Sequence, residues 1–129
     1  MPDLPEILDI ETVAQTKLFT IEDVKLRFSN GEERHFERIK GRASGAVMVL
    51  PLLDDNTLLL IREYGVGLER YIMAFPRGAV DVGETFEQAA NRELMEEVGY
   101  KAGHLEFLTE FAVSSAYITA TIKIGRAHV

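Results

Sequence analysis

Residues 78–100 read GAVDVGETFEQAANRELMEEVGY, and this stretch contains the clearest helix pattern of the chain. Thr85 followed by Gln88 fits a capping box, in which each side chain bonds the backbone N–H of the other residue. Gly99 is a natural helix stop, because glycine readily adopts the left-handed conformation that ends a helix. The pattern therefore predicts a helix over residues 86–98 with a loop on each side.

One face of the predicted helix carries apolar and acidic side chains together. At 100° per residue, one stripe contains Phe86, Ala89, Ala90, Glu93 and Glu97, with Leu94 and Val98 at its edge and Glu96 on the other side. The inward face thus begins apolar and ends in carboxylates. Burying such carboxylates without partners is costly.

The three glutamates Glu93, Glu96 and Glu97 repel one another at these spacings. They also lie near the carboxyl end of the helix, where the helix dipole disfavours anions. A hard cation bound by oxygen ligands, Mg²⁺ or Mn²⁺, relieves both effects. Arg92 is either a partner that orients a glutamate or an ordinary surface arginine. For the glutamates, the alternative to a metal site is a solvated acidic face.

Length and composition indicate an ordinary globular protein. The chain has 129 residues, of which 47% are hydrophobic and 27% are charged. Its 14 basic and 21 acidic residues give a net charge of -7, which argues against nucleic acid as a partner. There is no cysteine, the amino terminus is too acidic for a signal peptide, and the apolar run at 46–53 is too short to span a membrane. We expect a soluble cytoplasmic protein without a membrane partner.

The amino-terminal part alternates between apolar and polar residues, which predicts strands over about residues 7–36. Asn30-Gly31 predicts a hairpin turn, since both residues tolerate positive φ. This part is too small to be stable alone, so we expect it to pack on the rest of the chain or on a second subunit. The polar connector at 40–45 predicts a boundary between an amino-terminal β layer, residues 1–40, and a domain beginning at residue 44.

Further strands are expected on both sides of the helix. Residues 46–53 and 57–62 are almost continuously apolar and predict central strands of a sheet, although Pro51 favours an edge or a bulge. Shorter strand patterns follow at 70–75, 105–113 and 117–124. Strands, one strong helix and further strands predict an α+β fold with a mixed sheet.

The stretch resembles the signature of a known family, the Nudix box. The matching positions are Gly78, Glu84, Arg92, Glu93, Leu94, Glu96, Glu97, Gly99 and Tyr100. Over nearly all of residues 8–117 the chain is similar to the ADP compounds hydrolase branch of this family, the NudE type. The resemblance implies a Nudix α/β/α sandwich with a mixed sheet, preceded by a small antiparallel β layer.

Membership of the family implies a metal-dependent pyrophosphohydrolase. Candidate substrates are ADP-ribose, NADH and short diadenosine polyphosphates, from which hydrolysis of the diphosphate releases AMP. The resemblance implies a catalytic set of Arg92, Glu93, Glu96 and Glu97 with Mg²⁺ or Mn²⁺. Glu93 and Glu97 are the principal metal ligands, and Glu96 is an additional one, directly or through water. The backbone carbonyl of Arg77 is a further candidate, while Glu84 acts through water or only holds the loop.

Several departures from the family concern substrate choice. Where many ADP-ribose hydrolases carry Gln-Tyr-Arg, a glutamate and a proline, this chain has Glu63-Tyr64-Gly65, Ala74 and Ser115. These departures argue against strict specificity for ADP-ribose. Arg62 and Arg77 are candidate phosphate-binding residues. Tyr64 and Tyr117 are candidates for stacking on a base, with packing in the core or at an edge as the alternative.

The end of the chain differs from the family. Relatives continue for a further strand, a loop that often carries a catalytic glutamate, and a helix. Residues 124–129, IGRAHV, do not resemble the family and look like a translated sequencing adapter; the alternative is a frayed natural tail. We therefore predict an incomplete Nudix domain over 44–123 and a non-native tail over 124–129. The complete protein is expected to be a homodimer. The alternative function is a non-catalytic nucleotide-binding or interaction domain, or an inactive fragment that lacks the carboxy-terminal catalytic loop.

Overall fold

The computed structural model describes residues 3–129. The chain divides into two compact units, each of which is described here by itself. The first unit contains the residues up to Arg42 together with Ala112–Ala120, and the second contains Ala43–Phe111 together with Thr121–Val129. None of the described residues belongs to a helix with the length and apolar character needed to cross a membrane.

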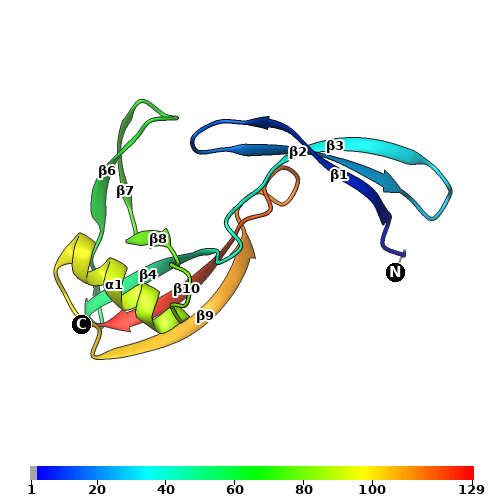
Figure 1. Ribbon diagram of the computed structural model, residues 1–129. Helices are drawn as coiled ribbons and strands as arrows, with labels where there is room; N and C mark the ends of the chain where they lie inside the picture. Colours follow the sequence, from blue (N-terminus) through cyan, green and yellow to red (C-terminus); the bar gives the residue numbers. More distant parts are fainter. Residues whose placement is uncertain (1–2) are drawn as a thin grey trace. The chain divides into compact units, whose positions relative to one another are not determined.

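The first unit is built on a three-stranded antiparallel sheet. Its strands are β1 (Glu6–Gln15), β2 (Thr20–Arg27) and β3 (Glu33–Ile39), in the order β1-β2-β3 (Figure 1). The later segment of this unit runs beside the end of β3, where the Ile39 N–H donates to the Tyr117 carbonyl at 2.6 Å. The separate antiparallel β layer expected from the sequence is confirmed.

The β2–β3 turn lies at Asn30-Gly31, as predicted. Gly31 has a φ of 86°, and its N–H donates to the Phe28 carbonyl at 2.9 Å. Asn30 does not take a positive φ; instead its side chain accepts the Glu32 N–H at 3.0 Å. The asparagine therefore contributes a side-chain hydrogen bond to the turn, and the glycine alone contributes the left-handed conformation.

The second unit contains a mixed sheet and a separate hairpin. The sheet has the order β5-β4-β10-β9, and β8 also pairs with β4. Because β10 runs parallel to β4 while β5 and β8 run antiparallel to it, the mixed sheet is confirmed. Strands β6 and β7 form the hairpin. The strands are β4 (Ala46–Asp54), β5 (Thr57–Leu58), β6 (Ile61–Gly65), β7 (Arg70–Ala74), β8 (Arg77–Ala79), β9 (His104–Ala112) and β10 (Thr121–His128).

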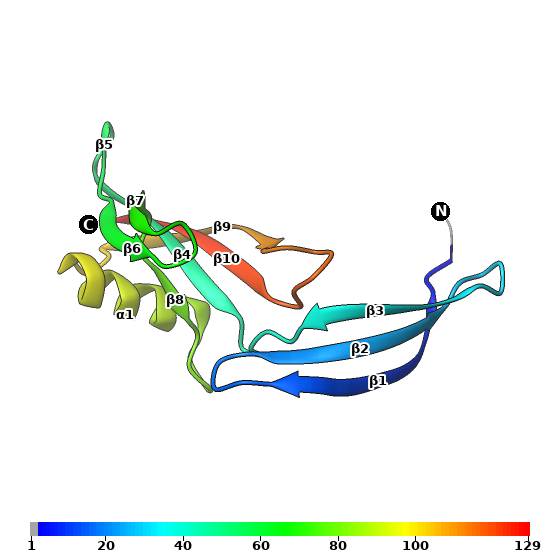
Figure 2. The same cartoon turned by 90° about the horizontal axis from the view of Figure 1, so that it is seen from above.

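The predicted helix is present with the predicted ends. Helix α1 spans Phe86–Val98 and lies along one face of the mixed sheet (Figure 2). Its capping box is complete, since the Gln88 N–H donates to Thr85 Oγ1 at 3.1 Å and the Thr85 N–H donates to Gln88 Oε1 at 2.9 Å. Gly99 closes the helix in the left-handed conformation, with a φ of 74°. Within residues 3–129, α1 is the one α-helix and therefore the one helical layer on this sheet.

The core of the second unit lies between α1 and the central strands. Its fully buried residues are Val49 of β4, Ala90 and Leu94 of α1 and Ala127 of β10. Phe86 packs over Gly125 of β10, where a β-carbon would come within 2.6 Å of the ring. This core fixes the face of α1 that points toward the sheet, and Glu93 lies on that face.

The strand predicted over residues 57–62 is wrong. Only Thr57 and Leu58 pair with β4; the chain then leaves this sheet, and β6 begins at Ile61. The β4 edge that a longer strand would need is already used, because Met48 pairs with Arg77 of β8. Leu58 and Leu60 are consequently 47% and 44% exposed.

Of the two positions predicted for Pro51, the edge is wrong, because β4 has neighbours on both sides. A register shift between β4 and β5 does begin at the next residue, Leu52. The Val49 N–H donates to the Pro76 carbonyl, and the Pro51 carbonyl accepts from the Leu59 N–H, both at 2.9 Å. Alternate residues of a strand direct their backbone groups to the same side, so the missing N–H of Pro51 lies on the side away from β10. The proline therefore interrupts no hydrogen bond between β4 and β10.

The last predicted strand, residues 117–124, lies four residues later in the structure as β10. Its parallel register runs from Ile122 opposite Ala46 to His128 opposite Leu52, so residues 124–128 belong to the strand. Periodicity misplaced this strand because its position depends on the partner β4, which lies some seventy residues earlier in the printed sequence. Strands over 70–75 and 105–113 are confirmed as β7 and β9.

Candidate active site

Glu93 is the most buried carboxylate of α1, with an exposure of 8%. It extends the apolar face of the helix, as its place in the stripe predicts. Its carboxylate lies against Gly78 of β8, where an added β-carbon would overlap it. The first glycine of the stretch therefore provides the space that allows this carboxylate to approach the strand.

Arg92 holds the loop before the helix and one glutamate of the helix at the same time. Its Nε and Nη2 donate to the two oxygens of Glu84, each at 2.9 Å, and its Nη1 donates to Glu93 Oε1 at 2.8 Å. Nη2 also donates to the Ala79 carbonyl at 2.9 Å. Hydrogen bonding to Glu84, more than any other contact, raises the pKa of Arg92. The geometry is that of an arginine that orients Glu93, and not that of a free surface side chain.

Glu84 is held by this arginine and by its own loop. Its Oε1 accepts the backbone N–H of Asp81 at 2.8 Å. The hydrogen bonds from Arg92, followed by the one from Asp81, lower the pKa of Glu84 from 4.5 to about 2. Of the two roles considered for Glu84, these contacts correspond to holding the loop.

Glu97 lies one helical turn after Glu93 and faces β8. Its Oε2 accepts the backbone N–H of Arg77 at 3.2 Å. The residue as a whole is exposed, and its carboxylate is only partly desolvated. This burial raises the pKa of Glu97, and the charges of Glu93 and Glu63 raise it further, against a lowering by Arg77. Glu97 therefore lies in an excess of negative charge.

Glu96 stays apart from this pair. Its side chain is 58% exposed, and its contact is with Arg92, whose Nη1 lies 3.5 Å away. Within residues 3–129, no group of three His, Asp or Glu side chains is close enough together to hold a metal ion. The structure thus brings Glu93 and Glu97 together and leaves Glu96 outside, on the other side of the helix.

A divalent cation fits the donors that are present. Glu93 and Glu97 offer hard carboxylate oxygens, and their mutual repulsion is relieved by positive charge between them. Mg²⁺ is commonly bound through one or two carboxylates, with waters and substrate phosphates completing its coordination. Two glutamates are therefore a sufficient protein contribution for this ion.

The predicted phosphate-binding residues lie in different surroundings. Arg77 of β8 adjoins the carboxylates, and its Nη2 donates to Glu63 Oε1 at 3.0 Å. Arg62 of β6 lies beside the ring of Tyr71, with its Cζ 5.2 Å from the ring centroid. Because side chains alternate along a strand, Arg62 and Tyr64 point to the face of the hairpin opposite to Glu63.

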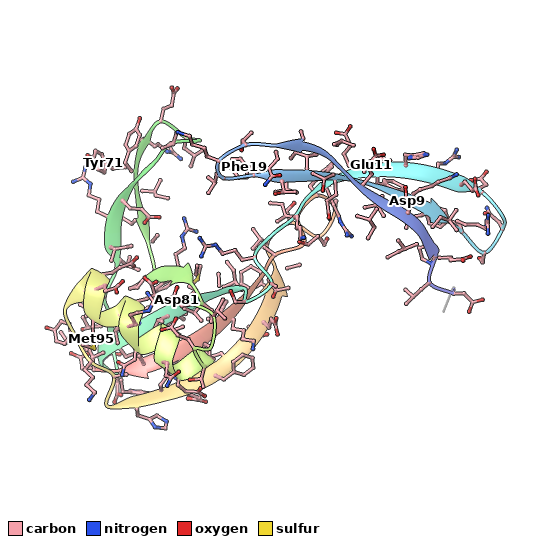
Figure 3. All side chains as sticks on the ribbon, viewed as in Figure 1. Asp9, Glu11, Phe19, Tyr71, Asp81 and Met95 are labelled. Atoms are coloured by element: carbon pink, nitrogen blue, oxygen red, sulfur yellow. The ribbon has the colours of Figure 1, made fainter. Side chains whose placement is uncertain are left out.

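The two candidate tyrosines belong to different units. Tyr64 is 52% exposed and packs edge to face against Tyr71, which Figure 3 shows projecting from the hairpin, with a centroid distance of 5.4 Å. Tyr117 belongs to the first unit, is 67% exposed, and borders a pocket of about 500 Å³ that also includes Ile21 and Phe36. Tyr64 is therefore an edge aromatic of the hairpin, and Tyr117 lines a pocket of the amino-terminal sheet.

Two features beside the site were missed from the sequence. Glu63 faces Arg77 and Glu97, a position that the alternation along β6 indicates once Arg62 and Tyr64 are placed on the other face. A groove of about 370 Å³ also opens beside Glu97; it is lined by Leu59, Leu60, Ile61, Arg62, Glu97, Val98 and Tyr100. Because the groove combines segments from two elements, no local pattern predicts it.

The fold and the carboxylate helix define the class of protein. A family model described as the NUDIX domain matches residues 43–122, and the chain belongs to the Nudix family. A second family model, the NudE-type Nudix hydrolase N-terminal domain, matches residues 5–38. Together the two matches give the chain the organisation of the NudE type.

Individual relatives agree with this assignment. The chain is 48% identical over 120 residues to the ADP compounds hydrolase NudE of Escherichia coli (strain K12), covering 93% of this chain and 64% of the relative. It is 32% identical over 124 residues to the ADP-ribose pyrophosphatase of Bacillus subtilis (strain 168), covering 91% and 65%. A crystal structure of an ADP compounds hydrolase has a TM-score of 0.91 at 44% identity, covering 99% of this chain and 69% of that chain. The chain thus spans slightly less than two thirds of the length of these two curated relatives.

Proposed function

We propose that this protein hydrolyses the diphosphate linkage of ADP-linked compounds, with Mg²⁺ or Mn²⁺ as cofactor, and releases AMP. The observation that carries the proposal is the convergence of Glu93 and Glu97 beside Gly78 and Arg77. The names of the two curated relatives, an ADP compounds hydrolase and an ADP-ribose pyrophosphatase, support the substrate class. ADP-ribose, NADH and short diadenosine polyphosphates are the substrates to test first.

The site residues have two roles: some would bind the cation, and Arg92 orients one of these ligands. Glu93 and Glu97 would bind the cation, with the Arg77 carbonyl as a further ligand and Glu96 contributing through water. When bound, the cation neutralises the diphosphate and lowers the pKa of a water molecule. Arg92 orients Glu93 through its hydrogen bond to Oε1.

Positive charge for the substrate comes from arginines outside this network. Arg77 adjoins the carboxylate pair and would bind a phosphate, with Arg62 reaching a second one. Tyr64 of the hairpin would stack on the base, while a role in base stacking for Tyr117, which belongs to the first unit, stays a prediction. In the overall reaction, water adds across one P–O bond of the diphosphate, so that AMP and a phosphorylated remainder are the two products.

The direct test is release of AMP by the chain. ADP-ribose, NADH and diadenosine polyphosphates are incubated with the chain in Mg²⁺, in Mn²⁺ and in EDTA, and AMP is measured by liquid chromatography. We expect AMP only with a divalent cation, and about a hundredfold less of it from the Glu97→Gln variant. Nucleotide binding without AMP from any of these substrates in either metal would favour the alternative, a non-catalytic nucleotide-binding domain.

We also propose that the amino-terminal layer, residues 1–40, forms a homodimer interface beside a Nudix domain over residues 44–123. Strand β1 leaves large apolar side chains uncovered: Ile7 is 56% exposed, Ile10 is 43% and Val13 is 50%. Such a surface favours a partner. Light scattering coupled to size-exclusion chromatography measures the mass and tests this proposal. The non-native origin of residues 124–129 stays a prediction that the coding nucleotide sequence tests, and the cytoplasmic location also stays a prediction.

A further inference from the structure

Glu63 faces the candidate metal site from strand β6, although it lies outside the Nudix box of residues 78–100. Its Oε1 lies 3.0 Å from Arg77 Nη2, and the two side chains are 37% and 45% exposed. The pair therefore connects the β6–β7 hairpin to β8, at the residue that precedes Gly78. Because both partners are partly exposed, the ion pair can open without burying an unpaired charge.

Arg77 contacts two carboxylates in two ways. Its side chain bonds Glu63, while its backbone N–H donates to Glu97 Oε2 at 3.2 Å. The other arginine near the site, Arg92, is already bound to Glu84 and Glu93. Arg77 is thus the arginine next to the carboxylate pair that a phosphate can engage by displacing one partner.

Without a cation, the site repels a diphosphate. The carboxylates of Glu63, Glu84, Glu93 and Glu97 outnumber the two guanidinium groups, since Arg77 pairs with Glu63 and Arg92 pairs with Glu84 and Glu93. Glu93 and Glu97 would hold a divalent cation, and its charge would offset this excess and favour phosphate oxygens at the site. A phosphate carries more negative charge than a carboxylate and bonds arginine through two oxygens, so it can then replace Glu63 at Arg77.

We propose that Glu63 is a positioning residue that withholds Arg77 from phosphate until a divalent cation is bound. This inference rests on the proposed function and deepens it, since it sets the order of binding as cation first and nucleotide second. In the bound state Arg77 exchanges the Glu63 carboxylate for a phosphate. The role of Glu63 is therefore to suppress nucleotide binding by the metal-free site.

The test compares two binding reactions that need no turnover. ADP binding is measured in EDTA, and Mn²⁺ binding is measured without nucleotide, by calorimetry on the chain and on Glu63→Gln. We expect Glu63→Gln to tighten ADP binding in EDTA by roughly twofold to fivefold, because Arg77 is released and one negative charge is removed. The same variant should weaken Mn²⁺ binding by a similar factor, because the site loses a negative charge.

A matched control removes the same charge elsewhere on the hairpin. Glu69 is exposed in the turn between β6 and β7, and Glu69→Gln should change neither affinity. A purely structural role of Glu63 predicts that Glu63→Gln weakens both reactions. Weakening of both, or affinities equal to those of Glu69→Gln, overturns the proposal. Failure of the unaltered chain to bind Mn²⁺ at all contradicts the proposed function instead.

A second variant tests the same idea from the partner residue. Arg77→Gln should weaken ADP binding in EDTA only slightly, because Glu63 already occupies the guanidinium there, and should weaken ADP binding in Mn²⁺ much more. In the double variant Glu63→Gln/Arg77→Gln, the increase in ADP affinity that Glu63→Gln alone shows in EDTA should disappear. An equal loss of ADP affinity by Arg77→Gln in both conditions contradicts the exchange, and this holds even where Glu63→Gln fails to fold.

Discussion

The carboxylate of Glu93 occupies the space beside Gly78 that a β-carbon would need, with Oε2 at 2.6 Å from the ideal β-carbon position. One residue belongs to helix α1 and the other to strand β8, so this contact sets how closely the helix end and the strand approach. Arg92 Nη1 also donates to Oε1 of the same carboxylate, at 2.8 Å. Glu93 is therefore confined by a backbone and by a guanidinium.

Substitution of Gly78 by alanine should displace Glu93. The new methyl group overlaps the carboxylate, so Glu93 must move out of the site, and we expect Mn²⁺ affinity to fall by about tenfold or more. Gly67→Ala is the control, since no atom lies within 4 Å of its added β-carbon. Calorimetric titration with Mn²⁺ measures both variants, and equal affinities would show that Glu93 does not contribute to the metal site.

Glu97→Gln should remove most metal binding while leaving the fold intact. The amide keeps an oxygen for the Arg77 N–H but removes the charge that attracts a cation. We expect circular dichroism unchanged, and Mn²⁺ affinity and AMP release reduced by about a hundredfold. Glu87→Gln, an exposed residue in the first turn of the helix, should behave like the unaltered chain. An unchanged rate for Glu97→Gln would exclude Glu97 from the site.

Substitution of Arg92 by lysine should reduce both the stability of the fold and the affinity for Mn²⁺. The guanidinium bonds both oxygens of Glu84 and one oxygen of Glu93, and an ammonium group cannot reproduce this planar arrangement. We expect Arg92→Lys to lower the melting temperature by roughly 4–8 °C and to weaken Mn²⁺ binding. Thermal unfolding followed by circular dichroism measures the first effect. Full stability with lysine would mean that charge alone matters at this position.

Glu84 should make the protein less stable in acid. Its pKa is lowered from 4.5 to about 2 in the folded state, so the folded state binds its proton less readily than the unfolded chain does. The stabilisation is complete above about pH 4.5 and is lost as the pH falls toward 2. In urea unfolding between these values, the stability of Glu84→Gln should fall less steeply with decreasing pH. If the stability of the unaltered chain and of Glu84→Gln falls equally steeply with decreasing pH, the hydrogen bonds from Arg92 do not lower the pKa of Glu84.

Ile10→Lys should weaken self-association if the amino-terminal layer is a dimer interface. Ile10 lies on β1 and is 43% exposed, and a lysine there opposes burial against a second copy. Glu11→Lys changes the next residue, which faces the other side of the strand, and serves as the control. A decrease in mass by light scattering for Ile10→Lys alone supports the interface. If the unaltered chain is a monomer at high concentration, the proposed dimer interface is wrong.

Local patterns predicted the helix accurately because its ends depend on neighbouring residues. Thr85, Gln88 and Gly99 fix the two ends through bonds within a few residues of chain, and these bonds are present in the structure. The stripe that ends in Glu93 and Glu97 depends only on the helical repeat. The family could likewise be identified from this stretch, since the box is contiguous in sequence.

The strands were predicted less well because their limits depend on distant partners. Residues 57–62 have a strand pattern, yet β8 occupies the edge of β4 that they would need. Pro51 is tolerated in a central strand only because its missing N–H lies away from β10. Neither fact can be read from a local window, since each depends on which segments meet across the sheet.

The sequence by itself determined the helix, its carboxylates and the family, because all three are encoded within residues 78–100. The tertiary structure decided which of those carboxylates lie near one another. It placed Glu93 against Gly78 and Glu97 against the Arg77 backbone, left Glu96 in solvent, and brought in Glu63 from another strand. The physical reason is that helical spacing defines faces, whereas the charge around a carboxylate depends on residues that only the folded chain brings near it.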